Sequence, residues 1–316
     1  MRILVTGCLG FIGSHFCRYM LNDPYNEIVG LARNSNQRNL MRIGDFKADP
    51  RFNLHFIDLD RDPLADAFQD VEVVVNFAAK TFVDYSIQDP LPFINSNLIG
   101  AFRMLEEARK SRSVRLFCQV STDEVYGAIL DGSYSEDSKL NPTNPYAATK
   151  AGSDMLTVSY FNTYKLPIII TRTENNYGPW QSREKVFPTF IRRALNNKPL
   201  PVYGDGKHSR MWLHVMDHCY AINHLIGKGK AGEIYHVAGD EELQNLELAK
   251  TILRLMKKPE DMIEFVPDHN IRPGHDRRYA LDSSKIRATG WRPAYSIETG
   301  FASTVAWYCD HKWWFT

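Results

Sequence analysis

Short apolar runs rich in β-branched residues alternate with longer amphipathic segments through the first half of the chain. Six runs have the composition of buried strands: 3–5, 27–31, 54–57, 73–75, 114–117 and 167–170. Three segments between them place apolar residues at helical spacing: 11–21, 94–109 and 146–164. This alternation predicts an α/β fold with a doubly wound parallel sheet that is covered by helices on both faces. Such sheets bind ligands at the carboxyl ends of their strands.

The pattern changes after about residue 173, where prolines and glycines separate shorter elements. One further helical run covers 246–257. A length of 316 residues is typical of about two domains. We therefore expect a larger domain over 1–172 and a smaller, mixed domain over 173–316, with part of about 212–238 returning to the larger one.

The charge balance and the cysteines exclude several classes of protein. Lys and Arg together number 38 and Asp and Glu 37, a formal net charge of +1, which argues against nucleic-acid or polybasic membrane partners. The five cysteines are scattered and form no C-x-x-C pair, as expected for reduced thiols in the cytoplasm. No run approaches the ~18 apolar residues of a membrane span. We expect a cytoplasmic protein with neither a nucleic-acid nor a membrane partner.

Three glycines follow the first predicted strand at a spacing of three and three: Gly7, Gly10 and Gly13. Without a Cβ, such a turn lets the backbone approach a pyrophosphate closely. Phe11 and Ile12 begin the helix, whose N-terminus favours negative charge. The arrangement predicts a Rossmann-type dinucleotide site made of these five residues.

The end of the second predicted strand bears on the choice of cofactor. An NAD site usually carries an acidic residue there, but this chain has Arg33 and no carboxylate between Val29 and Gly44. An arginine can pair with a 2′-phosphate, so NADP is favoured, and NAD stays open as the alternative. Asp58 and Leu59, after the third strand, are expected at the adenine.

Tyr146 and Lys150 lie four residues apart on one face of a predicted helix. A free phenol has a pKa of about 10, so its use as a base at neutral pH costs about 4 kcal/mol unless the phenolate is stabilised. Lys150 and a positive nicotinamide ring could supply that stabilisation. Together with the glycine turn and with Ser121 and Thr122 after the fifth strand, the pair resembles a short-chain dehydrogenase/reductase of the extended type.

Two adjacent carboxylic residues, Asp123 and Glu124, follow directly. A hydride transfer alone needs no carboxylates, whereas elimination of water needs both an acid and a base. Neighbouring carboxyl groups in unlike environments can have separated pKa values and take those two roles.

Three segments resemble the dTDP-glucose 4,6-dehydratase family. They are TDEVYG at 122–127, NNYGP at 175–179 and RPGHDRRY at 272–279, and the similarity runs from residue 1 to about 308. The resemblance implies a nucleotide-diphosphate sugar substrate, a tightly bound and recycled nicotinamide cofactor, and a homodimer built on paired helices. The product would be a 4-keto-6-deoxy sugar.

The resemblance also implies roles for single residues. Tyr146 would take the O4 proton while hydride leaves C4, assisted by Thr122 and Lys150. Glu124 would then remove the C5 proton, and Asp123 would protonate the departing C6 hydroxyl. The remaining implied cofactor residues are Ala78, Ala79, Lys80, Asn97 and Ser121, and the implied substrate residues are Asp84, Thr122, Asn175, Lys185, Arg210, Arg272 and His275.

Departures from the family pattern leave alternatives open. Glu174 stands where a serine is common, Lys80, Thr81 and Phe82 differ from the usual residues, and the Arg33 region is closer to the NADP-using GDP-mannose 4,6-dehydratases. A 4-epimerase or decarboxylase of the same fold remains an alternative, as does a non-catalytic NADP-binding protein. His214 and His218 have metal-ligand spacing but lack the accompanying glutamate, so we expect no metal.

Overall fold

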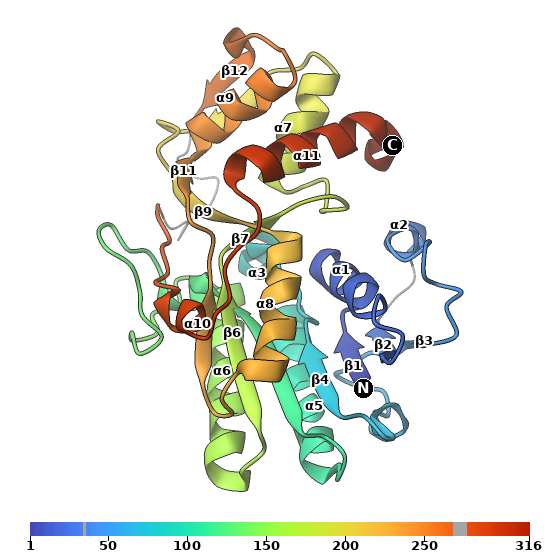
Figure 1. Ribbon diagram of the computed structural model, residues 1–316. Helices are drawn as coiled ribbons and strands as arrows, with labels where there is room; N and C mark the ends of the chain where they lie inside the picture. The colour runs from blue at the N-terminus through green and yellow to red at the C-terminus, as the bar shows by residue number, and fades with distance from the viewer. Residues whose placement is uncertain (34–35, 268–276) are drawn as a thin grey trace.

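The computed structural model describes residues 1–33, 36–267 and 277–316. Within these residues the larger part is a parallel sheet of seven strands in the order β10-β6-β5-β4-β1-β2-β3 (Figure 1). The strands are β1 (Arg2–Thr6), β2 (Glu27–Ala32), β3 (Phe52–Phe56), β4 (Val73–Asn76), β5 (Leu116–Thr122), β6 (Ile168–Thr173) and β10 (Ile234–Val237). The predicted doubly wound α/β fold is confirmed.

Helices cover both faces of this sheet, as the alternating side chains of its strands require. On one face Ile3 and Val5 pack with Phe16 of α1 (Phe11–Met20) and Ile222 of α8 (Val215–Lys228). On the other face Leu4 packs in the cluster that contains the buried residues of α5 (Gly100–Lys110) and α6 (Pro145–Tyr164). The side chains of Ile3, Leu4 and Val5 therefore alternate between two separate cores.

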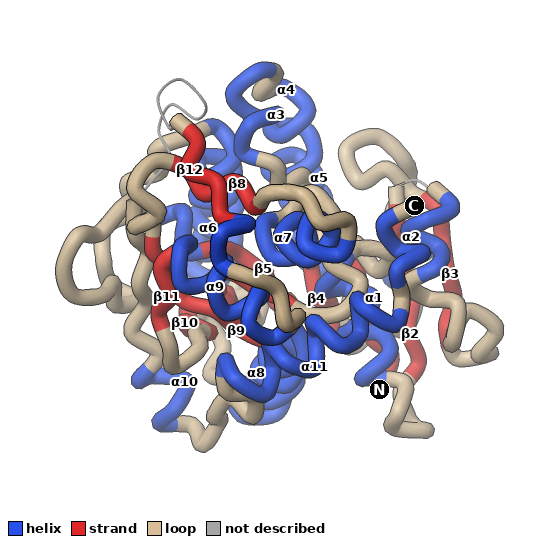
Figure 2. Tube along the Cα trace, turned by 90° about the horizontal axis from the view of Figure 1, so that it is seen from above, coloured by secondary structure: helices blue, strands red, loops and turns tan. Residues whose placement is uncertain are grey.

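The smaller part of the molecule has a core of its own, with large aromatic side chains. It contains the strands β7 (Asn175–Tyr177), β9 (Ser209–His214) and β11 (Glu242–Gln244), and the pair β8 (Leu200–Tyr203) with β12 (Ile263–Val266). The helices α7 (Val186–Leu195), α9 (Asn245–Leu255) and α11 (Ile297–Asp310) cover them. Figure 2 shows these elements from above.

Short elements complete the described chain. They are α2 (Gln37–Met41), η1 (Ala65–Phe68), α3 (Val83–Gln88), α4 (Leu91–Phe93), η2 (Ile94–Ile99), η3 (Asp123–Tyr126), η4 (Glu260–Met262), α10 (Ser284–Ala288) and η5 (Lys312–Phe315). The helix predicted over 94–109 is interrupted, because η2 is a π-helical stretch and α5 begins at Gly100. The strand predicted over 114–117 lies at 116–122, where it pairs with both β4 and β6.

The chain returns to the large sheet late, because β10 pairs in parallel with β6 at the sheet edge. The division of the chain at residue 172 stays a prediction. None of the described helices combines the length and the apolar composition that a membrane span needs.

Candidate active site

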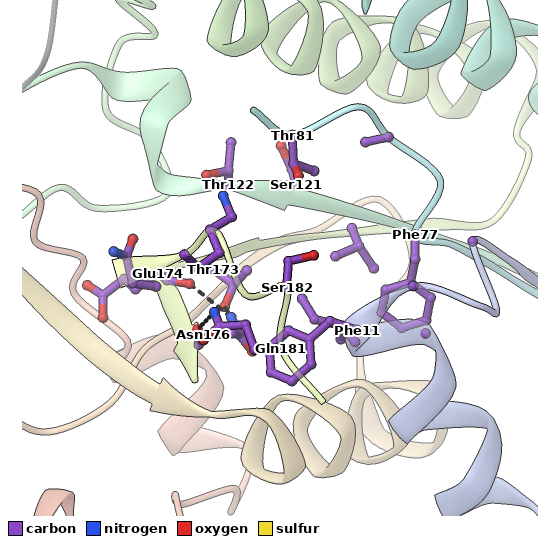
Figure 3. A pocket seen from close by; sticks show the side chains of 18 of the residues that line it. Phe11, Phe77, Thr81, Ser121, Thr122, Thr173, Glu174, Asn176, Gln181 and Ser182 are labelled. Atoms are coloured by element: carbon purple, nitrogen blue, oxygen red, sulfur yellow. Dashed lines mark hydrogen bonds between the residues drawn. The ribbon is translucent and has the colours of Figure 1, made fainter. Parts of the chain in front are cut away.

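A cavity of about 440 Å³ opens at the carboxyl ends of β1, β4, β5 and β6 (Figure 3). Residues that directly follow or end these strands line it, among them Gly7, Phe77, Thr122 and Thr173. Loops of the smaller part close the other side with Gln181, Ser182 and Lys185. The cavity therefore lies where a parallel sheet presents ligand groups.

The glycine turn forms one end of the cavity. Gly7 has a φ of +67°, and a Cβ on Gly13 would lie 2.4 Å from the Gly7 carbonyl oxygen, so other residues do not fit at these positions. Helix α1 has no side-chain cap and no acidic residue in its first turn. Its N-terminal amide groups therefore face the cavity as an anion site that fits the pyrophosphate of a dinucleotide.

Helix α6 supplies the tyrosine and the lysine. Asn144 caps its start by accepting from Ala147 N, and Pro145 occupies the first turn. Tyr146 and Lys150 are buried and line the cavity. The Lys150 ammonium donates to the Val120 carbonyl at 2.6 Å.

The pKa values of this pair move in opposite directions. Burial lowers the pKa of Lys150 to about 8, and the charge of Asp154 opposes that decrease. Burial raises the pKa of Tyr146, the charges of Glu124 and Asp123 raise it further, and a side-chain hydrogen bond with Thr122 lowers it. At neutral pH the site therefore favours an uncharged Tyr146 phenol and a charged Lys150 ammonium group.

The two carboxylic residues lie on the η3 turn at the end of β5. The Thr122 hydroxyl accepts from Glu124 N at 3.4 Å and donates to Asp123 Oδ1 at 3.0 Å. Asp123 is buried, and burial together with the charge of Glu124 raises its pKa to about 7. Both residues line the cavity with Tyr146, so the structure brings the predicted acid, base and tyrosine together.

The predicted cofactor residues fall into two groups. One group lines the cavity: Gly7, Gly10, Phe11, Ile12, Gly13, Ala78, Ala79, Ser121, Tyr146 and Lys150. The other group lies outside the lining: Arg33, Asp58, Leu59, Lys80 and Asn97. The amide of Asn97 accepts from Lys80 N at 2.8 Å and donates to Thr149 Oγ1 at 3.0 Å, so it connects the loop after β4 to helix α6.

Arg33 lies near carboxyl groups at the end of β3. Burial and the neighbouring Asp60 raise the pKa of Asp58, and the charge of Arg33 lowers it. Arg33, which the sequence predicts as a partner of a 2′-phosphate, thus lowers the pKa of two carboxyl groups of the protein, those of Asp58 and Asp60.

The predicted substrate residues are partly in place. Asn175 and Lys185 line the cavity with Thr122, whereas Asp84 on α3 does not. Arg210 is buried 4.5 Å from the ring centroid of Tyr279, and its charge lowers the pKa of Asp123. Arg272 and His275 lie outside the described residues.

Two cavity residues were absent from the predicted site. Glu174, in the link between β6 and β7, is buried and accepts from Leu281 N at 2.9 Å. Burial and the charge of Asp123 raise its pKa well above the ordinary range. Arg42 donates to the Leu9 carbonyl at 3.1 Å and to the Trp180 carbonyl at 3.0 Å, so it connects the glycine turn to the smaller part.

Further lining residues were missed as well: Asn39, Phe77, Thr81, Val120, Thr173, Asn176, Gln181, Ser182, Val186, Phe187 and Trp212. Position offered a usable signal for Thr173 and Glu174, because they come three and four residues after the strand predicted over 167–170. Nothing in the local pattern singled out Gln181 or Trp212.

The histidine pair is used in packing. His214 precedes α8 and accepts from Met216 N, while His218 bonds Asn176 Oδ1 at 3.1 Å. Over residues 1–33, 36–267 and 277–316, no group of three His, Cys, Asp or Glu residues is arranged to hold a metal ion.

Comparisons with known proteins cover nearly the whole chain. A family model described as GDP-mannose 4,6 dehydratase matches residues 4–304. The low-salt glycan biosynthesis protein Agl12 of Haloferax volcanii is 44% identical over 98% of this chain and 98% of its own. A dTDP-glucose 4,6-dehydratase of an Actinoplanes species is 43% identical over 99% of this chain and 100% of its own.

Solved structures show the same relationship. DesIV from Streptomyces venezuelae, a dTDP-glucose 4,6-dehydratase with NAD and TYD bound, has a TM-score of 0.91 at 41% identity, covering 99% of this chain and 98% of its own. A UDP-glucuronic acid 4-epimerase from Bacillus cereus, in complex with UDP-glucuronic acid and NAD, has a TM-score of 0.92 at 27% identity, covering 98% and 99%.

Proposed function

The chain belongs to the family of nucleotide-sugar 4,6-dehydratases, and on that premise we propose that it takes a dTDP-glucose-like substrate to the 4-keto-6-deoxy sugar. The enzyme is a hydro-lyase that uses a nicotinamide dinucleotide. One observation carries the proposal: Asp123, Glu124 and Tyr146 line one cavity. A dehydratase needs an acid and a base in addition to the tyrosine of the redox step.

The family resemblance supplies the proposed sequence of proton transfers, and the shared cavity lining of Asp123, Glu124, Tyr146 and Lys150 supports it. A nicotinamide dinucleotide held at the turn of Gly7, Gly10 and Gly13 would supply the hydride acceptor for C4 of the sugar and the hydride donor for C6. Tyr146 takes the O4 proton, and the Lys150 ammonium stabilises the phenolate by its charge. Glu124 then removes the C5 proton, which the 4-keto group has made acidic. Asp123, neutral up to about pH 7, gives its proton to the departing C6 hydroxyl.

The 4-epimerase neighbour supports a second candidate reaction on the same fold. Epimerisation at C4 needs the tyrosine but eliminates no water, and so makes no use of a buried proton donor such as Asp123. A non-catalytic NADP-binding protein would need none of Tyr146, Lys150 and Glu124. The chemistry of these side chains favours dehydration over both.

For the cofactor we now favour NAD over NADP. The similar solved dehydratase and epimerase structures hold NAD. Arg33 acts on Asp58 and Asp60, whose charges would also repel a 2′-phosphate. Release of the nucleotide from freshly purified protein, followed by mass spectrometry, tests the choice, and recovery of NADP alone would reverse it.

We also propose a homodimer in which the helices α5 and α6 of two copies pair. Large apolar side chains are exposed on these helices and on η2 beside them: Ile94, Ile99, Phe102 and Met155. Exposed apolar side chains grouped on adjacent elements are typical of an interface.

The assay for the reaction uses purified protein with dTDP-glucose, UDP-glucose, UDP-N-acetylglucosamine and GDP-mannose in turn. We expect the product of one of them, dTDP-glucose first, to have lost one water. An epimer without any water loss would instead support the second candidate.

Glu124→Gln tests the assignment of the base in the same assay. It should stop exchange of the C5 hydrogen with solvent deuterium while the protein keeps its nucleotide. Exchange at the wild-type rate would overturn the assignment.

A further inference from the structure

Four buried polar side chains form a continuous chain of hydrogen bonds behind the cavity. Asp154 Oδ2 accepts from Arg172 Nε at 2.9 Å, and Arg172 Nη1 donates to Tyr126 Oη at 2.5 Å. Tyr126 Oη in turn lies 2.7 Å from His236 Nε2. None of the four side chains is more than 1% exposed, so water does not compete for these hydrogen bonds. None of them belongs to the proposed reaction chemistry.

The donor and the acceptor of each hydrogen bond between these four side chains can be assigned. His236 Nδ1 lies 3.0 Å from the Asp282 carbonyl oxygen, which can only accept, so this nitrogen carries the hydrogen. Burial lowers the pKa of His236 to about 3, and its Nε2 is therefore an acceptor. Tyr126 consequently donates to His236 and accepts from Arg172, which leaves its hydroxyl one definite orientation.

The four residues come from the elements that carry the proposed catalytic groups. Tyr126 ends the η3 turn, which begins with Asp123 and Glu124. Asp154 lies on α6 one turn beyond Lys150 and two turns beyond Tyr146. Arg172 belongs to β6, which ends at the cavity, and His236 belongs to β10 at the sheet edge.

We propose that Asp154, Arg172, Tyr126 and His236 form a positioning network for the elimination half of the reaction. The network holds the carboxylate-bearing η3 turn in register with the tyrosine and lysine of α6. The inference rests on the proposed function, because it assigns the η3 turn to water elimination and α6 to C4 oxidation.

The η3 turn is anchored at Val125, which is buried and whose carbonyl accepts from Asn141 N at 3.0 Å, and the network adds a second anchor at the last residue of the turn. At its start the Thr122 hydroxyl accepts from Glu124 N at 3.4 Å, which is a long hydrogen bond. At its end Gly127 has a φ of +76°, so the chain turns away immediately. The buried ion pair with Asp154 holds the Arg172 guanidinium that donates to Tyr126, because an unpaired charge in this buried place would be strongly unfavourable.

The test separates the two halves of the reaction in the holoenzyme. The 6-deoxy analogue of the accepted sugar nucleotide has no C6 hydroxyl to lose, so reduction of the bound cofactor, followed by its absorbance, reports C4 oxidation alone. For Tyr126→Phe we expect that rate within about twofold of wild type. Dehydration of the full substrate and C5 deuterium exchange should fall by about tenfold to a hundredfold, the loss typical of a displacement of about 1 Å.

A matched control is available on α6. Tyr160→Phe removes a buried tyrosine hydroxyl that donates to Glu106 Oε1 at 2.6 Å, away from the cavity, and should leave the ratio of the two rates unchanged. If Tyr126→Phe does not fold, His236→Asn breaks the network from its other end, with the same expected split at smaller size. Equal loss of both rates, or undiminished dehydration, would overturn the network. A wild-type enzyme that dehydrates no sugar nucleotide would instead refute the proposed function.

Discussion

Asp123 and Glu124 are neighbours in the sequence, yet the fold gives them different surroundings. Asp123 is buried at the start of the η3 turn and has a pKa raised to about 7, first by burial and then by the charge of Glu124. Glu124 is partly exposed at the cavity. Unlike environments of two carboxyl groups are what an acid–base pair requires.

Asp123→Asn should therefore abolish dehydration and also stabilise the protein above about pH 7. Because the folded-state pKa is raised, the contribution of Asp123 to stability is present below the ordinary carboxyl pKa and is lost as the pH rises to about 7. A rise from 3.8 to about 7 corresponds to a free-energy difference on the order of 4 kcal/mol, which is an upper bound for the gain. Urea unfolding of both proteins at several pH values measures it, and a difference that is the same at all pH values would contradict the prediction.

Glu174 is a second buried acid at the same cavity, with a pKa held well above the ordinary range by burial and by the charge of Asp123. Glu174→Gln keeps an oxygen that accepts from Leu281 N, so we expect wild-type stability and activity near neutral pH. Glu174→Ala leaves that buried N–H without its partner and should cost about 1–3 kcal/mol of unfolding free energy. Thermal unfolding of the two variants compares them directly, and equal losses would contradict the prediction that a neutral amide can replace the Glu174 carboxyl group.

Helices, strands and turns whose formation depends on neighbouring residues could be predicted from the local sequence pattern. The periodicity of 146–164 and the cap at Asn144 together specify helix α6, and the glycine spacing specifies the turn after β1. The π-helical η2 was missed because its apolar residues keep helical spacing, while Asn97 bonds two segments distant in sequence.

The parts of the site that depend on long-range packing could not be predicted in this way. Gln181 reaches the cavity because the C-terminal η5 turn holds its loop: Trp314 Nε1 donates to the Gln181 carbonyl at 3.0 Å. Arg42 joins the same loop to the glycine turn through the Trp180 and Leu9 carbonyls. Residues some 130 positions apart leave no local signal of such contacts. The aromatic C-terminal segment therefore supports a wall of the cavity.

Trp314→Ala is expected to lower the stability of the protein and to weaken binding of the sugar nucleotide. Removing a buried tryptophan should cost about 3–5 kcal/mol of unfolding free energy. The released loop carries Gln181, Ser182 and Lys185, so the KM for the sugar nucleotide should rise several-fold while kcat changes less. Trp313→Ala, at a side chain 44% exposed, is the matched control and should change both quantities little. An unchanged KM in a destabilised Trp314→Ala protein would show that the loop does not depend on the turn.

The whole molecule has a formal net charge of only +1, although an anionic substrate would bind beside an anionic cofactor. The fold meets this locally: Lys185 and Arg42 line the cavity, and the N-terminus of α1 adds its dipole. Surface ion pairs such as Arg2–Glu27 and Arg18–Asp45 balance charge elsewhere. The location of charge, and not its sum, therefore matters for binding.

The exposed apolar side chains of α5 and α6 lead to the last prediction. Phe102 is 41% exposed on α5, and Met155 is 47% exposed on the neighbouring helix α6. If two copies pair through these helices, Phe102→Glu places a charge inside an apolar interface and should convert a dimer to monomers, because an unpaired buried charge is strongly unfavourable. Sedimentation equilibrium measures the mass of both proteins.

Phe265→Glu makes the same chemical change on strand β12, at a side chain 56% exposed and outside the α5–α6 surface, and it should leave the dimer intact. A monomeric wild type, or dissociation by both substitutions alike, would contradict pairing through α5 and α6. The glycine turn, Tyr146 and Lys150 of one chain line the same cavity, so we expect the Phe102→Glu monomer to retain its nucleotide even where its stability falls. Loss of nucleotide in step with dissociation would instead mean that pairing of the helices maintains the site, since α6 carries both Tyr146 and Lys150 on its cavity side.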